Sequence, residues 1–481
     1  MPHRIVSAPV DFGALRSEFG LVSAYPAEAG AEAGAVVDAF ACDRVDRTDI
    51  PFVTIDPPGA MDLDQALYLV RTRTGFLVHY AIADIGAVIT PDGALAAESG
   101  MRGQTFYFPD AAVPLHPPAL SEGAASLLPG CTRPVALWTI ELDARAEPQR
   151  YSVVRALVRS RARFDYTGVH TDAERGRLHP AIAALPEFGR LRIEAGLARG
   201  AIGLRLPAQC VVRDETTEGH WRLVVRPRTD AAEWNEQVSL LTGMCAARIM
   251  MDGEVPAARR LAVLRTMPPP AESALDSMRR TAHALGVAWP AEEAAGRILA
   301  RLDPGSPATL VLMSEATTLL RGASYTVVDG ATGESPGQET LRHSAIGALY
   351  AHVTAPLRRL SDRFATEICL ARCAGAEVPR WVREGLHGVA GTMRRSDGVA
   401  SKVDRACIDL TESAVLADRV GAEFTAVVVR EATANRPAMI FISDPPVLGP
   451  CTGDPPEGAA VRVRLSSADP GERKVIFTYP A

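Results

Sequence analysis

The fold and the function of the chain are indicated most clearly by the stretch Thr54-Ile-Asp-Pro-Pro-Gly-Ala-Met-Asp-Leu-Asp-Gln-Ala-Leu67, which carries three aspartates within nine residues. Asp62 and Asp64 are two residues apart, so on a β-strand their side chains would face the same side. The Pro-Pro-Gly turn at residues 57–59 would let Asp56 approach the same point. We therefore expect three carboxylates to converge.

Converging carboxylates repel one another unless a cation lies between them. Oxygen-only ligands suit Mg²⁺ or Mn²⁺ rather than zinc, and such an ion can activate a water and stabilise the leaving oxygen in phosphodiester hydrolysis. The alternative is a polar turn with solvated aspartates. Burial is favoured by the apolar residues interleaved with the acids, Ile55, Leu63, Ala66 and Leu67. The spacing by itself leaves both interpretations open.

A second stretch, His352-Val-Thr-Ala-Pro-Leu-Arg-Arg-Leu-Ser-Asp-Arg363, combines a helix break with adjacent arginines. Pro356 interrupts a helical pattern, and Arg358 and Arg359 follow directly. The start of a helix offers free backbone N–H groups, and an arginine offers a two-pronged donor for phosphate. The alternative is a capped surface helix with solvated arginines.

Around these stretches, the apolar patterns predict a large α/β body. Residues 76–85 and 135–142 are expected to form buried strands. Apolar residues recur on one face of a helix over residues 234–249. A further helical block is expected over residues 339–373, broken near Pro356, and another helix is expected after residue 381.

These patterns predict three domains. Residues 1–48 are expected to form a mostly helical lead segment, with helical pieces near residues 12–19 and 27–40. Residues 49–418 form the α/β body. Residues 419–481 form a small β-barrel, because apolar and arginine residues alternate there as they do on a strand.

The composition limits the classes of function. The chain has 481 residues and is 47% hydrophobic and 22% charged, which is typical of a globular protein. Its formal net charge of −6 means that any contacts with a polyanion must come from locally concentrated basic groups. The eight cysteines include no Cys-x-x-Cys pair, so buried thiols in a reducing cytoplasm are expected rather than zinc ligation.

The location of the protein is predicted from the absence of two sequence patterns. The N-terminus lacks the charged-then-apolar pattern of a signal peptide, and the sequence contains no run of 18 apolar residues. We therefore expect a cytoplasmic protein without a membrane partner.

The aspartate and arginine stretches together resemble the ribonuclease II family, whose catalytic domain is of the RNB type. The stretch Val78-His-Tyr-Ala-Ile-Ala-Asp-Ile85 and the proline-rich residues 107–127 are also similar to motifs of that family, in the same order. The resemblance covers roughly residues 51–416. It implies an α/β (α+β) RNB-type domain with a mixed sheet and surrounding helices, followed by a C-terminal OB-fold RNA-binding barrel.

The resemblance also implies an activity, 3′→5′ hydrolysis of single-stranded RNA with Mg²⁺ to release nucleoside 5′-monophosphates; Mn²⁺ is an alternative ion. Asp56, Asp62 and Asp64 would hold the ion, and Asp62 and Asp64 would act in catalysis. Arg358 would contact the scissile phosphate and stabilise charge in the transition state. A channel enclosed by one chain needs no second subunit, so a monomer is expected.

Further residues are implied to bind RNA. Tyr107 and Tyr166 would stack on bases, as in sequence-tolerant binding of single strands, although core packing is the alternative for each. Glu236 lies where the family has an acidic pair near the terminal nucleotide. Arg359, and Asp404 in an Asp-Arg-x-x-x-Asp motif, complete the predicted RNA-binding set.

The chain departs from the family at three places, one of which is Asp404, where the family's motif begins with a glutamate. Gln65 replaces a fourth aspartate, and its amide oxygen would be a weaker ligand than a carboxylate. The lead segment is expected to be helical rather than to form the cold-shock barrels with which family members often begin. The main alternative is therefore an RNA-binding or RNA-protecting protein whose catalysis is impaired by Gln65. A small-molecule phosphodiesterase or a structural protein is a third possibility.

Overall fold

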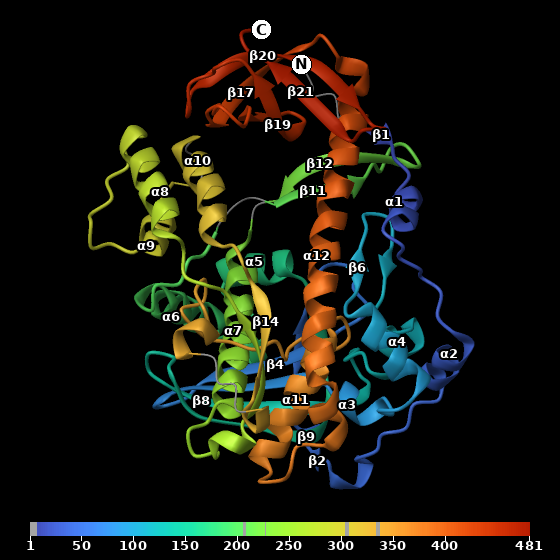
Figure 1. The fold of residues 1–481 in the computed structure, drawn as a ribbon. Helices are drawn as coiled ribbons and strands as arrows, with labels where there is room; N and C mark the ends of the chain where they lie inside the picture. Colours follow the sequence, from blue (N-terminus) through green and yellow to red (C-terminus); the bar gives the residue numbers. More distant parts are fainter. Residues whose placement is uncertain (1–6, 205–207, 227, 304–306, 333–336) are drawn as a thin grey trace.

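A broad body, a long helix and a barrel make up the computed structural model of the chain (Figure 1). The structure describes residues 7–204, 208–226, 228–303, 307–332 and 337–481. Helix α12 (Arg380–Leu416) rises from the body to the C-terminal barrel. The strand β1 (Ala8–Pro9), near the N-terminus, lies close to the barrel.

A mixed seven-stranded sheet forms the centre of the body. Its strand order is β10-β3-β4-β5-β8-β9-β2, with β10 parallel to β3, β2 parallel to β9, and the other neighbours antiparallel. The two buried strands predicted from the sequence correspond to β5 and β8. The strands are β2 (Val45–Asp46), β3 (Val53–Ile55), β4 (Gln65–Arg71), β5 (Gly75–Ala83), β8 (Thr132–Asp143), β9 (Pro148–Arg159) and β10 (Ala162–Phe164).

Both faces of this sheet are covered. Tyr80 and Trp138 face the main core, whereas Ala81 and Leu137, one position along each strand, face a smaller core. The alternation follows from the two-residue period of a strand. The main core is completed by the lower part of α12 and by three other helices, α6 (Leu185–Ala198), α7 (Asp230–Met250) and α11 (Leu360–Cys373).

Helix α7 confirms the helix predicted over residues 234–249. It begins at Asp230, where the Thr229 side chain caps it by accepting a hydrogen bond from the Ala232 N–H at 3.2 Å. Three shorter helices of the body are α3 (Ile85–Val88), α4 (Ala94–Arg102) and α5 (Tyr166–Glu174).

The helical block predicted over residues 339–373 is wrong in its first half. Residues 342–359 form two short strands, β15 (Arg342–His343) and β16 (Ala348–Leu349), and then an irregular loop. Gly347 has a φ of +69°, which ends any helix there, and the Ala351 N–H donates to the Gly243 carbonyl of α7 instead of to its own turn. The second half of the block is confirmed by α11.

Smaller units surround the body. A helical arm with its own apolar core consists of α8 (Glu272–Ala284), α9 (Ala295–Ala300) and α10 (Pro307–Ala316). Strands β11 (Ala208–Arg213) and β12 (His220–Arg226) form a small sheet with β1 beneath the barrel. Two further strand pairs are β13 (Leu261–Thr266) with β14 (Ser324–Asp329), and β6 (Phe106–Tyr107) with β7 (Ala112–Val113).

The C-terminal β-barrel predicted from the sequence is confirmed. Five strands close in the order β17-β18-β19-β21-β20, as an OB-fold requires. Val415 and Leu416, in the last turn of α12, pack into the barrel core and join it to the body. The strands are β17 (Glu423–Arg430), β18 (Ala438–Ser443), β19 (Pro446–Thr452), β20 (Ala460–Asp469) and β21 (Lys474–Thr478).

The described part of the lead segment contains two short helices, α1 (Gly13–Glu18) and α2 (Ala27–Gly34). The second predicted helical piece is therefore shorter than expected, since α2 ends at Gly34. The segment is anchored on the body by Arg44, whose buried guanidinium bonds Asp38 and Asp84.

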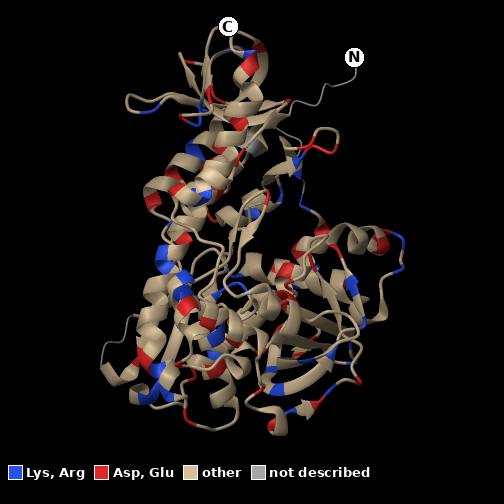
Figure 2. Cartoon of the chain, turned by 90° about the vertical axis from the view of Figure 1, so that its right-hand side faces the viewer, with Lys and Arg blue, Asp and Glu red and all other residues tan. Residues whose placement is uncertain are grey.

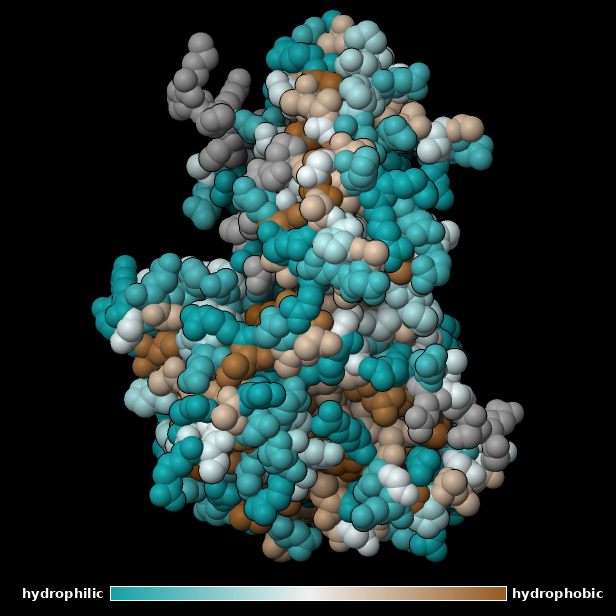
Figure 3. Space-filling view, turned by 90° about the vertical axis from the view of Figure 1, so that its left-hand side faces the viewer, coloured by the Kyte–Doolittle hydropathy of each residue, from teal (hydrophilic) through white to brown (hydrophobic). Residues whose placement is uncertain are grey.

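Basic and acidic residues are intermingled along the chain in Figure 2, and the face of the molecule shown in Figure 3 has only scattered apolar areas among hydrophilic ones. Within the described ranges, every helix is too short or too polar to cross a membrane.

Candidate active site

Several predicted site residues meet at one edge of the central sheet, where β10 and β3 end and β4 begins. Because β10 and β3 are parallel neighbours, Phe164 lies opposite Ile55, and the Asp56 N–H donates to the Phe164 carbonyl at 3.0 Å. Tyr166 follows at the start of α5, which the Asp165 side chain caps. The topology thus places Asp56 and Tyr166 side by side.

The aspartates lie on a loop, residues 56–64, which we call the aspartate loop. The expectation that Asp62 and Asp64 share one side of a strand is wrong, because β4 begins only at Gln65. Leu63 is bound to the Ser126 side chain and to the Leu127 N–H, so its backbone has partners in another loop rather than in a neighbouring strand.

Asp64 joins the two stretches singled out in the sequence. Its side chain is only 2% exposed; Oδ1 accepts a hydrogen bond from the Leu357 N–H at 2.7 Å, and Oδ2 accepts one from Arg358 Nε at 3.0 Å. Burial raises the pKa of Asp64 to about 7, although Arg358 and the Leu357 N–H both act to lower it. Asp64 therefore brings the aspartate stretch and the arginine stretch into direct contact.

Asp56 and Asp62 lie near this pair. Asp56 Oδ2 is buried without a hydrogen-bond partner, and burial raises the pKa of Asp56 to about 6. Arg358 opposes that rise, whereas the negative charge of Asp62 adds to it. Asp62 is half-buried, and its Oδ2 lies 3.5 Å from the Tyr107 hydroxyl.

The donors around Asp56 and Asp62 bear on whether a cation could bind here. In the part of the chain that the structure describes, no three His, Cys, Asp or Glu side chains are arranged to hold a metal ion. Asp64 is turned toward Arg358 and Leu357. Asp56 and Asp62 nevertheless offer carboxylate oxygens, which are the ligands that a hard divalent cation needs. One of them, Asp56 Oδ2, is buried and has no hydrogen-bond partner in the protein.

Gln65, expected to be a weak metal ligand, has protein partners at both ends of its amide. Its Nε2 donates to the Thr354 carbonyl at 2.6 Å, and its Oε1 accepts from the Tyr80 hydroxyl at 2.7 Å. The Tyr80 hydroxyl also lies 3.0 Å from Ser239 Oγ on α7. Sequence patterns do not single out these partners, since Tyr80 lies on a buried strand, Ser239 on a helix, and Thr354 is an uncharged residue beside the arginines.

The loop of residues 350–359, which we call the arginine loop, gives its two arginines different surroundings. The Arg358 side chain is 43% exposed and uses Nε for Asp64. Arg359, predicted to bind RNA, donates Nε and Nη2 to Asp362 at 3.0 and 2.8 Å. Asp362 is fully buried and also accepts from the Ala355 N–H at 2.7 Å, so this pair braces the loop.

Tyr107 is 49% exposed, which excludes the core-packing alternative for this residue. With Arg358, Arg359 and Asp404 it lines a cavity of about 210 Å³ against α12. Tyr166 is partly buried against the main core, so core packing remains a valid description of that residue.

Glu236 lies apart from that cavity. It is exposed on α7 and forms an ion pair with Arg228. It lines a different cavity, of about 540 Å³, with Tyr350 and His352. The structure therefore brings four predicted residues together at the smaller cavity and places Glu236 elsewhere.

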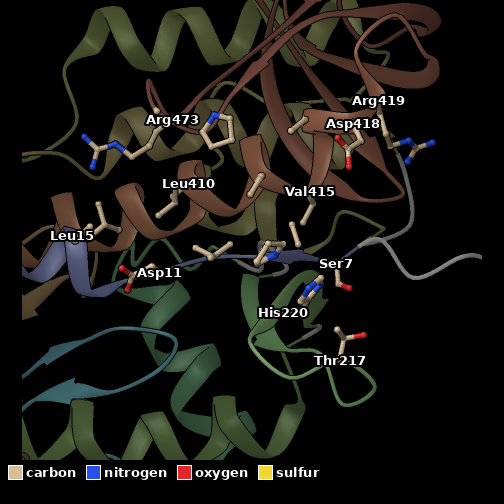
Figure 4. Close-up of a pocket in the computed structure, with 18 of the residues that line it drawn as sticks. Ser7, Asp11, Leu15, Thr217, His220, Leu410, Val415, Asp418, Arg419 and Arg473 are labelled. Carbon is tan, nitrogen blue, oxygen red and sulfur yellow. The ribbon is translucent and has the colours of Figure 1, made fainter.

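A larger open cavity, of about 1360 Å³, lies beneath the barrel (Figure 4). It is lined by the segment around β1 and α1, by β12, by the end of α12 and by the barrel. Arg473 of the barrel forms an ion pair with Glu18 of α1 at this cavity. None of the predicted site residues lines it.

Comparison with known proteins gives the family. The RNB domain model matches residues 44–369, and the model of the RNase II-type exonuclease C-terminal S1 domain matches residues 422–479. Ribonuclease R of Chlamydia trachomatis serovar D is 26% identical over 426 residues, covering 86% of this chain. The chain spans 58% of the length of that relative.

The same fold occurs in solved structures. The apo form of Mycoplasma genitalium RNase R superposes with a TM-score of 0.83 at 18% identity, over 97% of this chain and 77% of that one. Yeast Ssd1, a pseudonuclease, superposes with a TM-score of 0.67 at 13% identity, over 85% of this chain and 50% of that one. The fold by itself therefore does not distinguish a nuclease from a pseudonuclease. Because the RNB model matches more than half of its residues, the chain belongs to the RNB domain family.

Proposed function

We propose that the chain is a 3′→5′ exoribonuclease that hydrolyses single-stranded RNA with Mg²⁺ and releases nucleoside 5′-monophosphates. The observation that carries the proposal is the buried contact between Asp64 and the arginine loop, beside a half-exposed tyrosine at a small cavity. Membership of the RNB family and similarity to a relative named Ribonuclease R support the same activity.

The chain's own residues account for most of the proposed chemistry. Arg358 is exposed enough to contact the scissile phosphate, and its positive charge would stabilise the transition state. Asp64 fixes the direction of that guanidinium, and Tyr107 offers an exposed ring for a base to stack on. A divalent cation bound by Asp56 and Asp62, beside Asp64, would supply an activated water and neutralise charge on the phosphate.

The second candidate is an RNA-binding protein without catalysis. Two observations favour it: Gln65 brings no negative charge to the cluster, and a pseudonuclease shares the fold. This candidate predicts RNA affinity without metal-dependent degradation.

The two candidates are separated by incubating the protein with 5′-labelled single-stranded RNA, in Mg²⁺ or in EDTA. We expect a ladder of shortening products that is absent in EDTA and in Asp64→Asn. Asp454→Asn, at an exposed position in the barrel, is the matched control and should remain active. Intact RNA that is retarded on a native gel would identify the binding protein, and immediate release of the label as a mononucleotide would contradict the 3′→5′ polarity.

A further inference from the structure

The amide of Gln65 connects three elements of the body. The Ser239 hydroxyl of α7 contacts the Tyr80 hydroxyl of β5, which donates to Gln65 Oε1, and Gln65 Nε2 donates to the Thr354 carbonyl of the arginine loop. Tyr80 and Thr354 are both buried. Gln65 is thus a bridge from the sheet to the loop that carries Arg358.

The arginine loop depends on such bridges because it has no regular secondary structure of its own between β16 and α11. The Ala351 N–H is bound by the carbonyl of Gly243 on α7, and the Ala355 N–H by Asp362. The Leu357 N–H is bound by Asp64. Gln65 adds the bond at the Thr354 carbonyl, between these points, so it helps to set where Arg358 leaves the loop.

This arrangement requires an amide. A glutamine side chain offers a donor and an acceptor at the same time, whereas a carboxylate only accepts. A glutamate at this position would set a carboxylate oxygen against the carbonyl oxygen of the buried Thr354, and the loop would have to move. An aspartate is one CH2 shorter, so it would lose the contact with Thr354.

We propose that Gln65 is a positioning residue for Arg358, and that its amide is needed because it bridges Tyr80 and Thr354. This inference rests on the proposed exonuclease activity. If Gln65 instead impaired a metal site, restoring the family's aspartate at position 65 would raise turnover. The present inference predicts that Gln65→Asp lowers turnover.

The test compares kcat and KM on a short 5′-labelled single-stranded RNA for the wild type, Gln65→Asp, Gln65→Glu and Gln65→Met. The methionine has a similar length and no charge, so it separates loss of the donor from gain of a negative charge. We expect each variant to lose about tenfold or more in kcat, with KM changed by less than about threefold, because a misplaced Arg358 costs mainly transition-state binding. Gln149→Met, at an exposed glutamine of β9, should leave both constants unchanged.

A double-mutant cycle distinguishes positioning from a general structural role. If Gln65 acts through Arg358, Gln65→Met lowers kcat no further in an Arg358→Ala background. Tyr80→Phe, which leaves the Gln65–Thr354 bond in place, is a milder second variant and should lower kcat less than Gln65→Met. Circular dichroism and the melting temperature identify any variant that fails to fold.

The outcomes separate the inference from the proposed function. If the wild type is active and Gln65→Asp has an equal or higher kcat, the inference is overturned. It is also overturned if the loss of kcat in the double variant equals the product of the losses caused by Gln65→Met and Arg358→Ala alone. An inactive wild type that Gln65→Asp activates would also overturn it. Inactivity of the wild type and of Gln65→Asp would overturn the proposed activity, and the inference with it.

Discussion

At the scale of single residues, Asp64 shows how much of the site depends on one side chain. Its two carboxylate oxygens accept hydrogen bonds from the Leu357 N–H and from the Arg358 guanidinium, both in the arginine loop. Leu357 is 293 residues away from Asp64 in the sequence. A buried carboxylate that accepts two hydrogen bonds is held in one orientation. Contacts within the protein therefore fix the direction of Arg358.

The position of the arginine loop also depends on Gly243, which has no side chain and so lets the loop pack closely against α7. A Cβ at this position of α7 would lie 2.2 Å from the ring of Tyr350 and 2.5 Å from the Ala351 carbonyl oxygen. We expect Gly243→Ala to lower the free energy of unfolding by about 1–3 kcal/mol, because the added methyl group overpacks the contact. It should also lower RNA turnover by shifting the arginine loop.

The matched control is Gly388→Ala on α12, an exposed position where a Cβ meets nothing within 4 Å. Alanine is the better helix former, so this variant should gain about 0.5–1 kcal/mol. Urea denaturation measures both changes. A Gly243→Ala protein as stable and as active as the wild type would mean that the loop does not need this close approach.

At the scale of elements, the joint between α12 and the barrel contains a buried acid. Glu412 is 3% exposed, and its Oε1 accepts from Gln209 Nε2 at 2.7 Å and from the Leu448 N–H at 3.2 Å. Burial raises the pKa of Glu412 to about 7, and these two hydrogen bonds only partly oppose the rise. The helix and the barrel therefore meet at a carboxyl that is costly to ionise.

This cost makes stability depend on pH. Since the pKa of Glu412 is higher in the folded chain than its ordinary value of 4.5, the folded state binds more protons between about pH 4.5 and 7. The contribution of Glu412 to the free energy of unfolding must then fall as pH rises through that range. Glu412→Gln keeps the accepting oxygen without the charge, so it should be more stable than the wild type at pH 8 by up to about 3 kcal/mol.

At pH 5, where Glu412 is mostly protonated in the folded protein, the advantage of Glu412→Gln should largely disappear. Denaturation midpoints of the two proteins at pH 5 and pH 8 provide the measurement. An advantage that is equal at both pH values would show that ionisation of Glu412 is not its source.

At the scale of the whole molecule, charge is the feature that bears most on RNA binding. The net charge is −6, and basic and acidic residues are intermingled along the chain (Figure 2). Affinity for a polyanion must therefore come from a few local cations such as Arg358, not from an overall attraction.

We expect the affinity for RNA to fall as the salt concentration rises. A plot of log K against log salt concentration should have a slope of about −0.7 for each phosphate that the protein contacts. Arg358→Ala, introduced into the Asp64→Asn protein so that RNA stays intact, should reduce that slope by roughly one contact. The slopes of the two proteins, with and without Arg358→Ala, are measured by fluorescence anisotropy between about 50 and 200 mM salt. An unchanged slope would show that Arg358 does not contact phosphate.

The elements that could be predicted from the amino-acid sequence are those whose patterns are local. The buried strands β5 and β8, the helices α7 and α11, and the barrel all follow from apolar periodicity, and the two motif stretches indicated the family. The stretch from residue 342 to 359 was missed because many of its partners lie far away in the sequence, among them residues of α7, of β4 and of the aspartate loop, and periodicity carries no signal of such contacts.

The contacts of the site residues, in contrast, follow from the tertiary structure and could not be read from the sequence. In the folded chain, Asp64 binds Arg358, and Arg359 pairs with Asp362. Glu236 lines a separate cavity, and both ends of the Gln65 amide have partners in the protein. Residue types and spacing show which groups are available for such contacts. Which groups pair is settled by the packing of elements far apart in the chain, because a buried polar group must find its partner among whatever the fold brings within reach.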